Sequence, residues 1–111
     1  MGAALDQLCE RLRRSCDAES AHVLDETGKV IAGAGPSELL EGVVASAGGW
    51  SAVIAAEQET LADPNGTMLC LHQLADDRRL AVTATRRSSV GLVRQRMRKA
   101  SAEIGAALRR R

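Results

Sequence analysis

The chain has 111 residues, with 15 basic and 14 acidic side chains and a formal net charge of +1. Single domains cluster at about 100–150 residues, so we predict that residues 1–111 form one domain. The composition, 45% hydrophobic and 26% charged, is that of an ordinary globular protein, which argues against wholesale disorder. Trp50 is the only aromatic residue, which argues against aromatic ligand cages and against base stacking on single-stranded nucleic acid.

Cysteine usage and hydropathy together favour a cytoplasmic location. Cys9, Cys16 and Cys70 show no pairing pattern and no signal peptide precedes them, which is typical of a protein from a reducing compartment. Uncharged apolar runs stop well short of the roughly 18 residues that span a bilayer. We therefore expect no membrane span.

The small net charge hides an asymmetry along the chain. Residues 1–85 carry a balance of −7, whereas residues 86–111 carry +8 with Glu103 as their single acid. A basic C-terminal segment of this kind can bind nucleic acid or an anionic surface, here through Arg94, Arg98, Lys99, Arg109, Arg110 and Arg111. The alternative, which we favour, is a helix with a cationic face in water, since positive charge is stabilised near helix C-termini and no groove-reading motif is present.

The first half of the chain predicts a helix, a hairpin and a second helix. Residues 4–16 place apolar side chains on one helical stripe, at Leu5, Leu8, Cys9, Leu12 and Cys16. Two short apolar runs, 20–25 and 29–33, flank Gly28, whose tolerance of positive φ suits a tight hairpin turn. A helix over about 37–57 follows.

The second half predicts three strands and a last helix. The strands are expected at 57–62, 67–74 and 80–85, with the polar first one at a sheet edge. The last helix is expected from Ser88 or Ser89 to Arg110, with an apolar line at Val90, Val93, Met97, Ala100, Ile104 and Ala107 or Leu108. The order α-β-β-α-β-β-β-α predicts an α+β fold with a five-stranded antiparallel sheet sandwiched by helices.

The second helix carries two stripes. The larger side chains are Leu40, Val43, Ala47, Trp50 and Ile54, and the smaller ones are Gly42, Ser46, Gly49 and Val53. Glycine inside a helix costs about 1 kcal/mol relative to alanine, so the small stripe predicts a compensating close approach of another helix. The alternative is a break at Gly48-Gly49 that gives two short helices.

Motifs for catalysis, metal or cofactor binding are not found. Gly28-Lys29 lacks the other residues of a phosphate-binding loop, because Val30 stands where Ser or Thr is needed. Cys70 and His72 share a strand face, but no second ligand pair of matching spacing completes a zinc site. Paired acids such as Asp76-Asp77 fall in turns, where a raised carboxylate pKa is not expected. We therefore predict no enzyme activity, no metal, no cofactor and no small-molecule substrate, and assign the function to an interaction surface.

Three stretches resemble the Roadblock/dynein light-chain domain family. They are the opening 5–8, the hairpin residues 22–25 with 27–32, and the start of the last helix at 88–100. The order of elements is also similar, and the resemblance covers essentially the whole chain. Within the family it is closest to bacterial MglB-like regulators of small Ras-like GTPases.

The resemblance implies a profilin-like fold and a homodimer in which the second helices pack side by side and the sheets join edge to edge. It also implies that this helix region binds a small Ras-like GTPase, in an activating or co-regulatory role. The candidate partner and dimer interface residues are Glu38, Glu41, Gly42, Ser46, Gly49, Trp50 and Val53. The alternative is a scaffold in a motility, polarity or signalling complex without effect on GTP hydrolysis.

Overall fold

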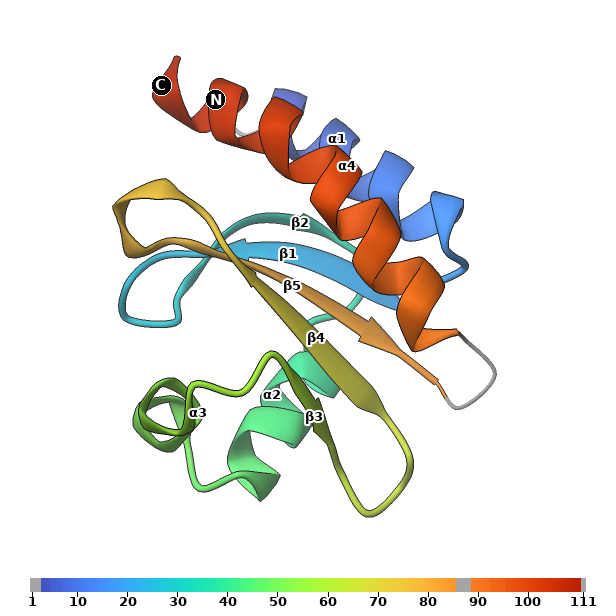
Figure 1. Ribbon diagram of the computed structural model, residues 1–111, viewed down its shortest axis with the longest axis vertical. Helices are drawn as coiled ribbons and strands as arrows, with labels where there is room; N and C mark the ends of the chain where they lie inside the picture. The colour runs from blue at the N-terminus through green and yellow to red at the C-terminus, as the bar shows by residue number, and fades with distance from the viewer. Residues whose placement is uncertain (1–2, 86–88, 111) are drawn as a thin grey trace.

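In the computed structural model, which describes residues 3–85 and 89–110, helices cover both faces of a single antiparallel sheet (Figure 1). The helices are α1 (Ala3–Ser15), α2 (Glu38–Ser46), α3 (Trp50–Ala56) and α4 (Val90–Arg109). The strands are β1 (Ser20–Leu24), β2 (Val30–Ala34), β3 (Thr60–Ala62), β4 (Met68–Gln73) and β5 (Arg79–Ala84), with a short 3₁₀ turn at Ala75–Asp77. The predicted α+β class is confirmed.

The sheet has the strand order β2-β1-β5-β4-β3, and all neighbouring strands are antiparallel. The inner strand β1 is buried along its whole length, and the central strand β5 is buried in all but its first residue. On these two strands the hydroxyls of Ser20 and Thr83, which lie opposite each other, form a buried hydrogen bond. Both polar groups are thereby satisfied in the interior, as buried hydroxyls must be.

Helices α1 and α4 cover one face of the sheet, and α2 and α3 cover the other (Figure 1). The first core joins the stripe of α1 and the apolar line of α4 to the sheet side chains Ala21, Val23, Ala32, Cys70, Leu80, Val82 and Ala84. The second core contains Leu24, Leu40, Val43, Val53, Leu61, Leu69, Leu71 and Ala81. The alternation along β4 is therefore as predicted, with Cys70 on one face and Leu69 and Leu71 on the other.

The continuous second helix predicted over 37–57 is wrong, and the alternative of two helices is correct. Gly48 and Gly49 both have φ near +100°, a conformation that side-chain-bearing residues rarely adopt. The amide of Gly49 donates to the carbonyl of Val44 and closes the end of α2. The chain then turns by 66° into α3. Gly49 and Val53 consequently do not continue the small-residue stripe of Gly42 and Ser46.

The start of α4 is held by a side-chain cap. The hydroxyl of Ser89 accepts from the amide of Leu92 at 3.3 Å, so Ser89 is the N-cap of this helix. Ser88, the other residue at which this helix was expected to begin, and Arg111 lie outside the described residues.

Arg94 ties α4 to the edge of the sheet. Its guanidinium donates to the Leu71 carbonyl at 3.2 Å, to the Thr60 hydroxyl at 3.1 Å and to the Glu59 carbonyl, and it lies 3.7 Å from the Glu59 carboxylate. Only 21% of the Arg94 side chain is exposed. This arginine, one of the cations considered for nucleic-acid contacts, is engaged in holding the short strand β3.

Replacing Arg94 with alanine is expected to lower the free energy of unfolding by about 2 kcal/mol, because several charge-assisted hydrogen bonds are lost at once. Urea unfolding followed by the fluorescence of Trp50 measures the change at fixed protein concentration. Arg98→Ala, at an exposed position one turn further along α4, is the control and is expected to stay within about 0.5 kcal/mol of the wild type. Equal losses in both variants would contradict the role given to Arg94.

Candidate interaction surface

The predicted interface residues fall into three groups by exposure. Glu38, Glu41, Gly42 and Ser46 are exposed on α2, and Gly49 and Trp50 are half-buried at the start of α3. Val53 is only 2% exposed and packs in the second core. The turn at Gly48-Gly49 explains this difference, since it directs the face of α3 that carries Val53 toward the sheet.

Small apolar residues cover the outer side of α2 and α3. Exposed positions in this region are Gly42, Ala45, Ala47, Ala52, Ala55 and Ala56. A Cβ atom added at Gly42 would meet nothing within 4 Å, so the space beside this part of α2 is open. Helices that are apolar on all sides are normally buried. The outer side of α2 and α3 is therefore the place on this face where a partner would remove apolar surface from water.

The same region contains the described stretch that most resembles a membrane segment. None of the described helices is alone long and apolar enough to cross a membrane, and only α2 and α3 taken together reach the required length and composition. Their 66° bend and the packing of Leu40, Val43 and Val53 on the sheet identify them as core helices. Their unusual apolarity reflects two apolar sides, of which the sheet covers one.

The edge strand β3 adjoins this surface. Thr60 and Ala62 are exposed, whereas Leu61 points into the core that also contains Leu40 and Val43. Within the described chain β3 pairs with β4 alone, so its outer edge has free hydrogen-bonding groups. The prediction of an edge strand here is confirmed, although the strand begins at Thr60 because Glu57 ends α3 in a left-handed conformation.

A cavity of about 690 Å³ opens between α2 and the β1–β2 hairpin. Its lining is mostly apolar, and it is bordered by Lys29 and Glu41. Two buried ring nitrogens in the lining, Nδ1 of His22 and Nε1 of Trp50, have no hydrogen-bond partner among the described residues. Burial lowers the pKa of His22, against the opposing effects of a hydrogen bond with the Gly35 backbone and the charge of Glu41, so the imidazole is neutral at pH 7. The cavity can thus receive an apolar group that carries an uncharged polar atom.

Trp50 forms one wall of this cavity through contacts with distant residues. A Cβ added at Gly28 would lie 2.4 Å from the indole, so the ring occupies the space that this glycine leaves free. The guanidinium carbon of Arg79 lies 5.9 Å from the ring centroid, within range of a cation–π interaction. The sequence pattern predicted only a hairpin turn at Gly28, and the φ of +89° at this glycine confirms that prediction. Gly28 also leaves room for the indole ring of Trp50. This second role was not predicted, because Gly28 and Trp50 are far apart in the chain.

A second glycine serves His22 in a similar way. Gly33 lies directly opposite His22 in the β1–β2 pair, and a Cβ there would come within 2.2 Å of the imidazole. The ring is accommodated because Gly33 has no side chain. The predicted strand run 29–33 ended at Gly33, and β2 extends one residue further, to Ala34.

Burial determines the chemistry of the three cysteines. All three cysteines are buried and free of disulfides, and desolvation raises the pKa of each thiol, to about 12 for Cys9. Such thiols remain protonated and behave as small apolar side chains. Residues 3–85 and 89–110 also contain no cluster of three or more His, Cys, Asp or Glu that could hold a metal ion.

Comparisons with known proteins give structural matches only. No protein-family model and no curated protein matches the sequence. Among solved structures, MglB of Myxococcus xanthus is 26% identical, covers 97% of both chains and superposes with a TM-score of 0.69. A Roadblock/LC7 domain from Streptomyces avermitilis is 25% identical, with a TM-score of 0.66 over 89% of this chain and 96% of that one. An MglB solved in a tetrameric arrangement is 14% identical, with a TM-score of 0.63 over 90% and 84%.

The superposition on MglB of Myxococcus xanthus covers 97% of both chains, and the four helices and five-stranded antiparallel sheet of this structure match those of the Roadblock/LC7 neighbours. The structure therefore has the Roadblock/LC7 fold in its MglB-like form, as the sequence resemblance implied.

Proposed function

We propose that this protein is a non-catalytic homodimeric regulatory module that binds a small Ras-like GTPase. The observation that carries the proposal is the exposed apolar side of α2 and α3 beside the free edge of β3. The resemblance to MglB-like regulators, supported by a structural match that spans 97% of both chains, gives the class of partner. The role is activating or co-regulatory.

The position of the apolar surface supports the proposed homodimer. The small residues occupy the C-terminal half of α2 and the outer side of α3, so a second copy can approach closely around a two-fold axis. The free edge of β3 lies beside them and can pair with the same strand of the other copy. Burial of the alanines and pairing of the exposed strand groups then both favour association.

The GTPase surface lies at the other end of α2. Glu38 and Glu41 are exposed in its first turns, and α2 and α3 carry no lysine or arginine. This acidic end adjoins the cavity walled by Trp50 and Gly49. It would favour a partner that presents a basic rim and an apolar group for the cavity, since complementary charge steers encounter and fixes orientation.

The first prediction concerns the dimer. Light scattering on the purified protein is expected to give twice the 11.7 kDa chain mass. Gly42→Arg is expected to yield a monomer, because the new side chain projects into space that is open in one chain and filled by the second copy. Gly91→Arg, which adds the same side chain at an exposed glycine of α4, is expected to remain dimeric. A wild-type monomer at micromolar concentration would refute the homodimer.

The second prediction concerns the partner. The tagged protein is used to capture proteins from source-cell lysate supplied with GDP or with a non-hydrolysable GTP analogue, followed by mass spectrometry. A small GTPase is expected to be enriched in the GTP-analogue sample. Capture of no GTPase in either nucleotide state would rule the proposal out.

A charge reversal then locates the contact. Glu41→Lys is expected to weaken binding of the purified GTPase about tenfold or more, because a contact with a basic rim becomes repulsive. Glu103→Lys, the same change on the α4 side of the sheet, is the control and is expected to leave the affinity unchanged. GTP turnover measured with the bound pair separates a regulator from a scaffold, which would bind without changing the hydrolysis rate.

A further inference from the structure

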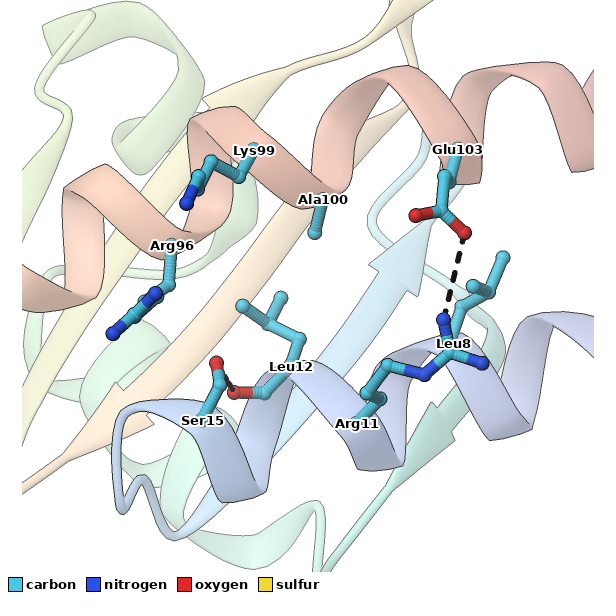
Figure 2. A pocket seen from close by; sticks show the side chains of 8 residues that line it. All are labelled: Leu8, Arg11, Leu12, Ser15, Arg96, Lys99, Ala100 and Glu103. Atoms are coloured by element: carbon cyan, nitrogen blue, oxygen red, sulfur yellow. Dashed lines mark hydrogen bonds and ion pairs between the residues drawn. The ribbon is translucent and has the colours of Figure 1, made fainter.

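A second concave surface lies on the opposite face of the molecule, between α1 and α4. One recess of about 180 Å³ is lined by Leu8, Arg11, Leu12, Ser15, Arg96, Lys99, Ala100 and Glu103 (Figure 2). A second recess of about 340 Å³ shares Leu8, Arg11 and Glu103 with it and continues to Ala106 and Arg110. We call the two together the α1/α4 groove. The sheet separates this groove from α2 and α3 (Figure 1).

The groove is predominantly cationic. Arg11, Arg96, Lys99 and Arg110 line it, against the single acid Glu103. Figure 2 shows Arg96 and Lys99 extending from α4 at one end, and Arg11 turned toward Glu103 at the other. The Arg11–Glu103 pair spans 3.6 Å, but both side chains are more than half exposed, so the pair contributes little and can exchange partners.

Arg96 carries a buried donor that is not satisfied. Its Nε atom is buried without a hydrogen-bond partner among the described residues. A buried donor of this kind costs free energy until an acceptor arrives. Arg94, by contrast, has all its contacts supplied by the edge of the sheet.

The floor of the groove is apolar and elongated. Leu8 and Ala100 are half-buried, and Leu12 lies beneath them in the first core. From Arg96 to Arg110 the α4 axis rises about 21 Å, at about 1.5 Å per residue. An occupant that covers this floor and reaches all four cations must therefore be extended, with an apolar stripe flanked by anionic groups.

We propose that the α1/α4 groove docks an acidic amphipathic helix from a partner protein. Leucine-like side chains on one face of that helix would rest on Leu8 and Ala100, and glutamate or aspartate side chains would reach Arg96, Lys99 and Arg110. Arginine binds carboxylates through paired parallel hydrogen bonds, which suits the unsatisfied Nε of Arg96. Because α2 and α3 lie across the sheet, this partner and the GTPase can be bound at once.

Two other anionic partners fit the groove less well. A membrane surface is flat and favours proteins that expose large apolar side chains. In the described chain the exposed large apolar side chains are Val30 and Leu92, and neither lines the groove. Nucleic acid would place its phosphates over an apolar floor and beside the carboxylate of Glu103. A helix with a leucine stripe uses both the floor and the cations.

The test uses a fluorescein-labelled synthetic peptide of 18 residues that forms a helix with a leucine stripe flanked by glutamates. Fluorescence anisotropy with the full chain measures its affinity. The comparison ligands are a peptide of the same composition in scrambled order, phosphatidylglycerol vesicles, inorganic phosphate and duplex DNA. We expect the striped peptide to bind at least about tenfold more tightly than the scrambled one, with affinity that falls as salt rises.

Paired variants of cationic residues on α4 locate the binding. The double variant Arg96→Gln, Lys99→Gln is expected to lower the affinity for the striped peptide about tenfold. The control double variant Arg98→Gln, Arg109→Gln is expected to lower this affinity less than about twofold. Both variants remove the same charge, but only the first changes residues that line the groove. Glu103→Gln is expected to tighten binding about threefold by freeing Arg11 and removing like charge. Circular dichroism confirms that each variant is folded.

Three results would overturn the proposal. The first is equal affinity for the striped and scrambled peptides, and the second is an equal loss in the two double variants, which would show general attraction to a cationic helix. The third is stronger binding of vesicles, phosphate or DNA than of the striped peptide. None of these results depends on GTPase capture, so the groove and the proposed function fail or succeed separately.

Discussion

The structure depends on the burial of its two central strands on both faces. All residues of β1, and all but the first of β5, are buried, so the sheet requires a helical layer above and below to keep these strands from water. α1 and α4 form one layer, and α2 with α3 forms the other. With no Phe or Tyr in the chain, these layers are filled mainly by Leu, Val, Ile, Ala, Met and Cys.

The Gly48-Gly49 turn has a particular effect on the α2–α3 layer. Because the chain bends there, Val53 reaches the core and Trp50 is carried back over the hairpin turn at Gly28. A straight helix would carry these residues away from the sheet along its own axis. The bend also leaves the alanines of both helices on the outer side, so one backbone feature accounts for the buried Val53, the cavity wall and the exposed apolar surface.

Local patterns predicted the strands and the first and last helices, because alternation and helical stripes depend on near neighbours in the chain. The α2–α3 break was only the alternative at that level and a continuous helix was predicted, since the apolar spacing fits one helix or two and only the φ angles of two glycines separate them. The cavity beside Trp50 and the contacts of Arg94 with the edge of the sheet could not be predicted from the sequence. Trp50 and Gly28 are 22 positions apart, and Arg94 reaches Glu59 and Leu71 across 35 and 23 positions. Such contacts exist only after the sheet and helices have assembled.

The charge asymmetry of the sequence becomes a division between the two faces. The basic segment forms α4, which lies with α1 on one side, while α2 and α3 carry only the acids Glu38 and Glu41. In the proposed homodimer the apolar side of α2 and α3 would form a two-fold contact between identical faces. Closing the dimer through this face would leave the cationic groove of each copy pointing outward, where it can recruit an acidic partner without competing with self-association.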